Sequence, residues 1–483
     1  MRKVAFSDHG QRDDEDVVCY DTETSSAEVR HCQVLQFAAI RADASLSELE
    51  AHDFRIRRLP YVVPSPEALQ VTGIDVRRLD DPSLPTEFEA MARVESILRA
   101  PQGRSRVFLT FNGIRFDDEV LRVALARNLR DSFFSSGRDA IRVDVMALVQ
   151  LAVAGGAGIS GATGEDGRPS WRLEAVCRAN GIGVDAHDAL GDARSTLDLA
   201  RLVREKAGWA WEAARRGGNA GRVDKRLAAD AGSDAVVWHF NHFGEPDLAP
   251  CIVVGQDSRR RFLLQDLRVQ VEAGVLATVD VSDHEARRAA GLRIVKAGNA
   301  PLLLSDDDAA RFAGAMSPED ARVLARRVFG RREDYLPVIE AFRTESFAKG
   351  EALTPEQRIY DGFASPADKA RMGSFHRAAS WDERAVIAFD DDRLAEYAAR
   401  ILAMTAPPSD DLFAPPGGEA GERFRAACAA TMARPYADAS SPWETLASCY
   451  PEADEAWREW ARETFEVDPA LVAACADTTS PVA

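Results

Sequence analysis

The sequence predicts an α/β protein that continues into a small β domain and ends in helices. Three observations support this fold class. Strand patterns alternate with helical patterns over the first 205 residues or so, short apolar runs separated by turn residues fill about 236–305, and helical patterns dominate from about 318 onward. Strands that alternate with helices are typical of a layered domain built on a mixed sheet.

The elements of the first part follow from its apolar runs, punctuated by turn residues. Strand runs lie at 17–24, 34–40, 54–56 and 107–111, and helical spacing covers 87–99, 118–128, 171–180 and 188–207. The first three strands form a meander. The fourth ends at the turn signal Asn112-Gly113, and the Gly-rich stretch 154–170 is expected to be a loop. In the second part, the runs 236–240, 251–254, 261–264 and 292–295 predict the short strands of the β domain.

Composition narrows the class of protein. The chain has 483 residues, 46% of them hydrophobic, and a net charge of −18. These values exclude a disordered chain and argue against passive binding of polyanions over the whole surface. No apolar run is long enough for a membrane span, and no secretory leader is expected. The seven cysteines include no CxxC pair, which favours a reducing, cytoplasmic environment over a disulfide framework. His239 and His242 form an HxxH without a nearby third ligand, so we interpret them as structural.

Acidic residues carry the chemistry. Asp21 and Glu23 end the first strand two residues apart, so both side chains lie on one face of the sheet. Two adjacent carboxylates repel each other unless a cation lies between them, and Mg²⁺ prefers oxygen ligands of this kind. The alternative is a solvated strand end.

Two further motifs add acids and a histidine. The first is Asn112-Gly-Ile-Arg-Phe-Asp117-Asp118, in which an acid follows a strand and a turn. The second runs from His187, just before a helix, to Asp192, about one turn inside it. The alternative interpretation is that Asp117, Asp118 or Asp188 simply caps a helix.

Together and in this order, the three motifs resemble the DEDDh class of 3′→5′ exonucleases. Further segments resemble the bacterial exodeoxyribonuclease I family: 20–24, 36–41, 71–74, 112–119, 171–174, 179–182, 186–189, 300–303, 317–320 and 359–363. The resemblance implies a ribonuclease H-like exonuclease domain with a mixed sheet over 14–205, an SH3-like β domain over 206–354 and an α-helical C-terminal domain over 355–477. It also implies a C-shaped molecule.

The resemblance also implies roles for individual residues. Asp21, Glu23, Asp117 and Asp192 would bind two Mg²⁺ ions, with Mn²⁺ able to substitute, and Glu23 would take part in catalysis. His187 would act as the general base on the attacking water. Thr24 and Arg172 match positions near the terminal nucleotide, and Arg122 and Phe133 match contacts further upstream. For Arg122 the alternative is an exposed helix position, and for Phe133 it is core packing.

Two features of the sequence affect how tightly the protein would bind its substrate. The family usually has an aromatic residue and a glycine after the Glu-Thr pair, whereas Ser25 and Ser26 stand here. The segment 201–226 carries eight basic and three acidic residues with Trp209 and Trp211 among them, which predicts a basic, aromatic strand-binding patch. The basic run 259–261 is a second candidate, and the alternative for the first is a solvated helix end.

The resulting expectation is a Mg²⁺-dependent 3′→5′ exonuclease that degrades single-stranded DNA to 5′-mononucleotides by two-metal hydrolysis, in DNA repair and recombination. The alternatives are a DEDDh exoribonuclease, a proofreading-type nuclease, or a non-catalytic single-stranded DNA-binding protein. The resemblance implies that the partners are single-stranded DNA and the acidic C-terminal tail of single-stranded DNA-binding protein. It also implies a cytoplasmic monomer without a membrane partner.

Overall fold

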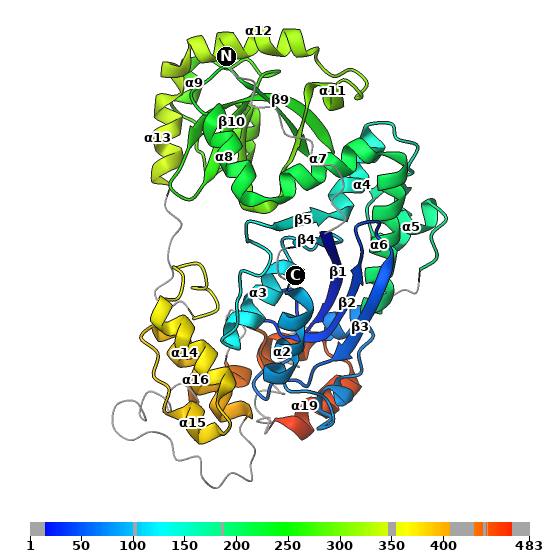
Figure 1. Ribbon diagram of the computed structural model, residues 1–483, viewed down its shortest axis with the longest axis vertical. Helices are drawn as coiled ribbons and strands as arrows, with labels where there is room; N and C mark the ends of the chain where they lie inside the picture. Colours follow the sequence, from blue (N-terminus) through cyan, green and yellow to red (C-terminus); the bar gives the residue numbers. More distant parts are fainter. Residues whose placement is uncertain are drawn as a thin grey trace, which may run out of the picture.

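The computed structural model describes residues 15–99, 104–184, 188–345, 354–405, 429–437, 441 and 443–465. Along its long axis, an antiparallel β domain occupies one end and a central sheet the middle (Figure 1). A group of helices, α14–α16, lies at the other end together with α19. Among the described residues, no helix combines the length and the apolar character that crossing a membrane requires.

The central sheet is mixed, as the sequence predicts. Its five strands lie in the order β3-β2-β1-β4-β5. β1 (Glu15–Thr24), β2 (Val34–Ala42) and β3 (Glu48–Arg55) form the expected antiparallel meander, and β4 (Ser105–Thr110) and β5 (Ala140–Asp144) run parallel to β1. The carboxyl ends of β1, β4 and β5 therefore meet at one edge of the sheet. The analysis of the sequence missed β5.

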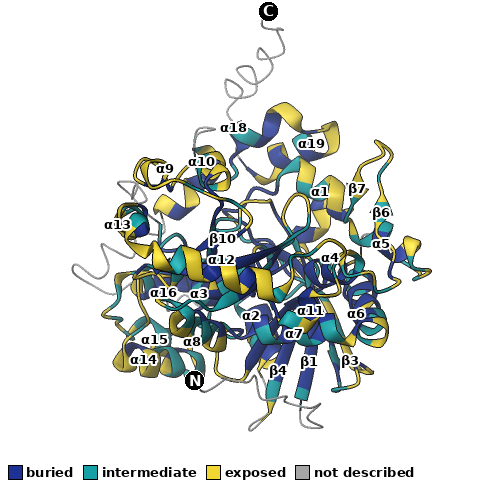
Figure 2. Ribbon diagram, turned by 90° about the horizontal axis from the view of Figure 1, so that it is seen from above, coloured by how far each residue is buried: buried dark blue, intermediate teal, exposed yellow. Residues whose placement is uncertain are grey.

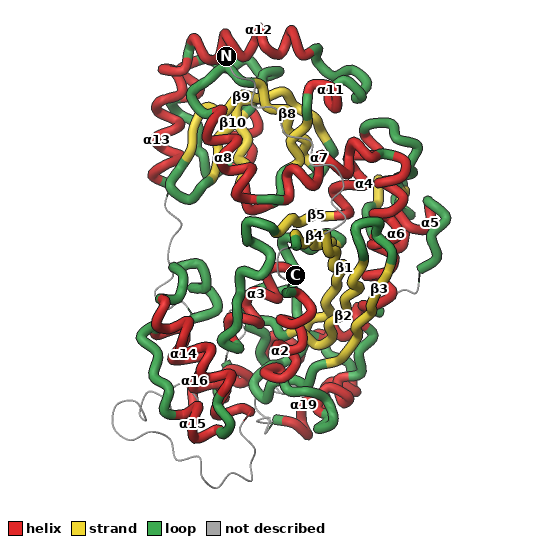
Figure 3. Tube along the Cα trace, viewed as in Figure 1, coloured by secondary structure: helices red, strands yellow, loops and turns green. Residues whose placement is uncertain are grey.

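Helices cover both faces of this sheet (Figure 3). Alternate residues of β1 join different cores: Val17 and Cys19 pack with α4, α6 and α7, whereas Val18 and Tyr20 pack with α2 and α3. The helices on the first face are α4 (Val145–Ala154), α6 (Ala189–Lys206) and α7 (Gly208–Gly218), and those on the second are α2 (Glu87–Leu98) and α3 (Asp117–Arg127). The inner strands are buried on both faces, as Figure 2 shows for β1 and β4, whereas the edge strand β3 is largely exposed. On the inner strands, functional side chains can therefore reach solvent only at the strand ends.

The β domain is one antiparallel sheet in the order β11-β10-β9-β8-β12. The strands are β8 (Val236–Asn241), β9 (Asp247–Gln256), β10 (Arg261–Asp266), β11 (Leu292–Lys296) and β12 (Leu302–Leu304). The four runs expected from the sequence correspond to the first four of these strands. Its helices are α8 (Ala220–Asp230), α9 (Ala273–Leu276), α10 (His284–Ala289), α11 (Asp306–Ala309), α12 (Pro318–Gly330) and α13 (Leu336–Thr344).

The last part of the chain is helical and packs back on the first. Its helices are α14 (Pro366–Arg377), α15 (Trp381–Ala385), α16 (Asp392–Thr405), α18 (Leu446–Cys449) and α19 (Glu455–Thr464). On α19, the indole Nε1 of Trp457 donates to the carbonyl of Pro64 at 3.0 Å, and that of Trp460 donates to Asp80 at 2.9 Å. The remaining elements of the first part are α1 (Pro66–Thr72), α5 (Leu173–Ala179) and the small hairpin β6 (Ala162–Thr163) and β7 (Pro169–Ser170). The domain boundaries after residues 205 and 354 stay a prediction.

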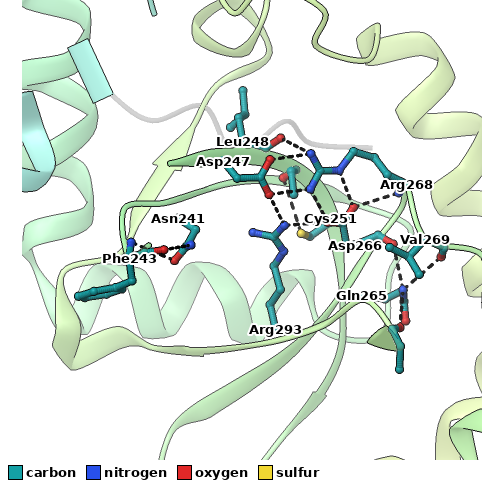
Figure 4. Close-up of polar contacts among 12 residues, drawn as sticks. Asn241, Phe243, Asp247, Leu248, Cys251, Gln265, Asp266, Arg268, Val269 and Arg293 are labelled. Atoms are coloured by element: carbon teal, nitrogen blue, oxygen red, sulfur yellow. Dashed lines mark hydrogen bonds and ion pairs between the residues drawn. The ribbon is translucent and has the colours of Figure 1, made fainter. Parts of the chain in front are cut away.

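A charged cluster ties together three strands of the β domain (Figure 4). Asp247 at the start of β9 accepts two hydrogen bonds from Arg268 at 2.7 Å and one from Arg293 at 2.6 Å. The same two arginines bind Asp266 at the end of β10. The hydrogen bond from Arg268 is the first cause that holds the pKa of Asp247 well below its usual range. The cluster therefore holds the ends of β9, β10 and β11 together.

We expect Asp247→Asn to lower the free energy of unfolding by about 1–3 kcal/mol at neutral pH, since hydrogen bonds to charged groups are lost. Because the native pKa is depressed, this stabilisation is present above the unfolded pKa of about 4 and disappears as the pH falls below it. Urea titrations across pH would check both statements. The exposed Asp307→Asn is the control, and a variant as stable as the wild type at neutral pH would contradict the prediction.

Candidate active site

The central strand β1 carries Asp21 and Glu23 beyond the end of its parallel neighbour. Its pairing with β4 runs from Glu15 to Cys19, whereas its pairing with β2 continues to Thr24 with an irregularity after Glu23. Asp21 and Glu23 therefore stand at the carboxyl edge of the sheet, on one face, where β4 no longer covers them.

The first turn of α6 brings Asp192 to the same place. One carboxylate oxygen from each of Asp21, Glu23 and Asp192 lies within 4.8 Å of the other two. Burial raises the pKa of Asp21 well above its usual range, and the negative charges of Asp117, Glu23 and Asp192 raise it further. Three converging carboxylates, with the pKa of Asp21 raised by its neighbours, are the donor set that a hard divalent cation would neutralise.

Asp117 joins this site from the first turn of α3. Its Oδ1 accepts hydrogen bonds from the backbone N–H of Thr22 at 3.1 Å and from the Thr22 hydroxyl at 2.6 Å. Burial nevertheless raises the pKa of Asp117 to about 7. Gly113 provides the room, since a Cβ there would stand 2.4 Å from Asp117 Oδ2 and 2.6 Å from the Cβ of Thr110. A side chain at position 113 would therefore collide with Asp117 and Thr110, which explains sterically why glycine follows Asn112 in this turn.

Asp118 points the other way, into the protein. Its Oδ1 accepts from the Tyr20 hydroxyl, and its Oδ2 accepts from Arg142 and from Ser135, both at 3.1 Å. Arg142 also donates to the carbonyl of Gly298 in the β domain. The structure thus separates two neighbouring acids that the sequence could not tell apart: Asp117 faces the carboxylate site, and Asp118 links β1, α3 and β5.

The third motif is described only in part. His187 lies outside the described residues. Asp188 begins α6 and accepts from the backbone N–H of Gly191 at 3.3 Å, so the helix-capping interpretation holds for that residue. Gln36 of β2 also donates to Asp188 at 3.3 Å, which ties the start of α6 to the sheet.

The residues predicted near the terminal nucleotide lie at two places. Thr24 is buried at the end of β1, and its hydroxyl donates to the carbonyl of Ser26 at 2.9 Å. Arg172 is exposed at the residue before α5. Ser25 and Ser26 are both buried, and together with Trp443 they line a small hollow. The small side chains therefore leave room for the C-terminal part of the chain at this turn.

The two residues predicted further upstream are joined through Tyr360. Arg122 is buried, with its guanidinium donating to the Tyr360 hydroxyl at 3.1 Å and to Ser135 at 2.9 Å. Phe133 is half-buried, and its ring centroid lies 5.9 Å from that of Tyr360 and 4.9 Å from that of Phe363. The next residue, Phe134, is instead the one that packs in the hydrophobic core against the sheet.

The basic, aromatic patch expected over 201–226 is buried or paired in part, whereas Lys206, Arg222 and Lys225 remain exposed. Trp211 is only 5% exposed and belongs to the main core. Arg201 and Arg204 donate to backbone carbonyls of the β2–β3 turn at 2.6 Å, and Arg215 pairs with Glu15. In the second candidate, Arg261 pairs with Asp257 and Glu345, whereas Arg260 pairs with Asp224 and keeps a largely exposed side chain. Apart from Asp257, the partners of these cations are far away in sequence, so the local charge count could not show which cations are already paired.

The two histidines of the HxxH pair, at the end of β8 and in the loop after it, are partly buried. Burial lowers the pKa of His239 to about 3 and that of His242 to about 4. Within the part of the chain that the structure describes, the only group of three potential ligands is the carboxylate cluster of Asp21, Glu23 and Asp192.

The segment that carries this site is similar to known exonucleases. Residues 18–200 match the RNase_T family model, described as an exonuclease. Exodeoxyribonuclease I of Haemophilus influenzae is 26% identical over 432 residues, which cover 81% of this chain and 88% of the relative. That of Escherichia coli is 26% identical over 396 residues, which cover 73% of this chain and 77% of the relative.

Solved structures extend the likeness in fold. An exonuclease I from Methylocaldum szegediense is 24% identical with a TM-score of 0.75, and the match covers 95% of this chain and 99% of that one. E. coli exonuclease I in complex with a dA16 oligonucleotide is 21% identical with a TM-score of 0.73, over 93% and 100% of the two chains. The expected relationship to exodeoxyribonuclease I and the fold class are therefore confirmed, and so is the expectation of a nuclease of the hydrolase class.

We expect divalent metal binding to strengthen as the pH rises through about 7, because Asp117 must lose its proton to act as a ligand. Thr22→Val removes the hydroxyl donor that lowers the pKa of Asp117, so the rise should move to higher pH. Calorimetric titration of the DNA-free protein with Mn²⁺ at several pH values measures this shift. Thr278→Val, which removes an exposed hydroxyl, is the control; identical pH curves for Thr22→Val and wild type would contradict the prediction.

We expect Asp118→Asn to destabilise the protein by about 3–5 kcal/mol, since it leaves the buried guanidinium of Arg142 without its carboxylate. Tyr20→Phe removes only one hydrogen bond to the same residue and should cost about 1–2 kcal/mol. Chemical denaturation followed by circular dichroism compares the two variants. Equal stability of the two would show that the charge of Asp118 is not what holds the network.

Proposed function

We propose that this relative of exodeoxyribonuclease I is a Mg²⁺-dependent exonuclease that removes 5′-mononucleotides from the 3′ end of single-stranded DNA. The observation that carries the proposal is the convergence of Asp21, Glu23 and Asp192 within 4.8 Å at the carboxyl edge of the sheet, with Asp117 beside Asp21. These four acids come from three separate parts of an exonuclease domain, and they meet where the sheet is open to a substrate.

The carboxylates fit a pair of hard cations. Oxygen ligands of this kind suit Mg²⁺, and Mn²⁺ accepts the same donor set. Asp21 would help to hold both ions, together with Glu23 on the same strand, Asp117 on α3 and Asp192 on α6. When bound, such ions stabilise the attacking and leaving oxygens of an in-line displacement.

The residues of the chain would then position the reactants. Asp21, Glu23, Asp117 and Asp192 would hold the ions, and Glu23 would also take part in catalysis. His187 is proposed to take the proton of the attacking water, a role that suits an imidazole at neutral pH. Arg172, which is exposed, would neutralise a phosphate near the 3′ end, and Thr24 would support the turn that the terminal nucleotide contacts.

A second surface would hold the strand upstream. Phe363 is 74% exposed and packs edge-on against Phe133. Both rings line a cavity of about 570 Å³ between α3 and the 355–397 segment, whose lining also includes five basic residues, Arg99, Arg130, Lys369, Arg377 and Arg393. Exposed aromatic rings beside cations are typical of surfaces that bind single strands by stacking and charge. In this arrangement Arg122 would act through Tyr360, because its own guanidinium is buried.

The relatives support the choice of substrate and partner. One solved structure is E. coli exonuclease I with a dA16 oligonucleotide, and another is titled as SSB/exonuclease I in complex with an inhibitor. We extend this to single-stranded DNA as the substrate of this chain and to the acidic C-terminal tail of single-stranded DNA-binding protein as its partner. A role in DNA repair and recombination, a cytoplasmic location and a monomeric state belong to the same proposal.

Asp21→Ala should reduce cleavage of 5′-labelled single-stranded DNA by at least about a hundredfold, the loss that follows from removing one electrostatic contact to a transition state. The wild type should produce a ladder that shortens from the 3′ end with Mg²⁺ and no ladder with EDTA. Asp198→Ala removes a more exposed acid from the same helix as Asp192 and serves as the control.

The same gel distinguishes the alternatives. An RNA and a DNA duplex of the same sequence are run beside the single strand. Preferential cleavage of RNA would overturn the substrate while keeping the site. Tight binding of DNA without turnover by the wild type would overturn the enzymatic proposal, as would full activity of Asp21→Ala.

A further inference from the structure

The loop between β8 and β9 presents an aromatic ring at the edge of the β domain. Phe243 is 42% exposed and belongs to none of the hydrophobic cores of the described residues. The side chain of Asn241 fixes the loop, since its amide donates to the carbonyl of Phe243 at 2.7 Å and accepts from the N–H of Phe243 at 3.4 Å. Figure 4 shows the ring pointing away from the charged cluster of the sheet. An aromatic ring is thus held out toward solvent on a fixed loop.

This ring stacks on a cation from the exonuclease domain. The guanidinium carbon of Arg115 lies 4.0 Å from the ring centroid of Phe243, and the His242 ring centroid lies 3.9 Å from it. Arg115 is itself exposed. Burial lowers the pKa of His242 to about 4, so Arg115 is the charged member of the group at neutral pH.

The stack lies along the edge of the sheet that carries the carboxylates. Arg115 stands two residues before Asp117, in the loop that follows β4. β4 lies between β1 and β5, and the three strands are parallel, so their carboxyl ends share that edge. Arg115 and Phe243 line one cavity together with Asn112, after β4, and Asp144, at the end of β5. A strand leaving the carboxylate site can therefore pass this ring.

We propose that Phe243, backed by Arg115, is a stacking contact for a nucleobase of the substrate strand close to the reacting 3′ end. The inference rests on the proposed function and adds to it a contact made by the β domain. Every base offers a π-face, so an exposed ring contributes grip without sequence preference, and an adjacent guanidinium suits the phosphate that accompanies the base. If the loop served only to hold the two domains together, the ring of Phe243 would be expected to be fully buried between them.

The test measures binding in EDTA, where no cleavage interferes. Single-stranded oligonucleotides carry 2-aminopurine at one of the first few positions from the 3′ end, and its fluorescence reports stacking at that position. Phe243→Leu keeps an apolar side chain but removes the π-face, and Phe243→Ala removes both. We expect both variants to weaken binding about tenfold and to relieve the quenching at one position. Leu336→Ala, which truncates an exposed apolar residue on α13 of the same domain, should leave both readouts unchanged.

Other outcomes have distinct meanings. If Phe243→Leu binds as tightly as the wild type with the same quenching profile, the stacking contact is refuted. If Phe243→Ala lowers only the melting temperature, the ring is a domain latch and the inference also fails. Absence of single-strand binding and cleavage by the wild type would instead refute the proposed function, and this measurement comes first.

Discussion

Four carboxylates at one edge of a sheet repel one another, and the packing around β1 has to hold them together against that repulsion. At the 4.8 Å limit that relates the oxygens of Asp21, Glu23 and Asp192, each pair of charges costs about 3–4 kcal/mol at an effective dielectric constant of about 20. The protein tolerates this cost because the strand between two helical layers is fixed from both faces. Divalent cations would neutralise this repulsion, so the same arrangement of carboxylates would bind them.

Long-range hydrogen bonds hold the individual acids. Thr22 holds Asp117, which is 95 residues away, with a backbone and a hydroxyl donor. Asp118 is held by Tyr20 and Arg142, and Arg142 continues to the carbonyl of Gly298 in the β domain. The first turn of α3 is therefore fixed to β1 on one side and to the β domain on the other. This connection explains physically why a nuclease site would be sensitive to the domains that follow it.

The sequence predicted well those structural features that depend only on neighbouring residues. β1, β2 and the first four strands of the β domain follow from apolar runs bounded by turn residues, whereas β3 (Glu48–Arg55) is polar and overlaps the predicted run 54–56 only at its end. Asp21 and Glu23 follow from strand periodicity, and Asp192 from its place one turn into a helix. β5 and α4 were missed because Ala140–Ala154 is mostly apolar and a single residue, the N-cap Asp144, separates the strand from the helix. Spacing alone could not say which of Asp117 and Asp118 faces the site, since the answer depends on partners in other elements; Asp117 was assigned only through the resemblance.

The errors share one cause. Arg215 looked available for DNA, but its partner Glu15 lies 200 residues away in sequence. Tyr360 and Phe363, which complete the surface around Phe133, come from a segment more than 220 residues further along the chain. Phe243 could not be connected with the site, because only the fold brings the β8–β9 loop to Arg115. The local sequence shows how many charged and aromatic residues a segment contains, whereas tertiary contacts determine which of their side chains remain exposed.

The central claim is that the carboxylates at the end of β1 hold divalent cations. A crystal of the protein soaked in Mn²⁺ and recorded at the manganese absorption edge tests it most directly. The account predicts anomalous peaks about 2.0–2.2 Å from oxygens of Asp21, Glu23 and Asp192, near the distances that hard divalent ions adopt. A saturating soak that gives no peak among these carboxylates would contradict it.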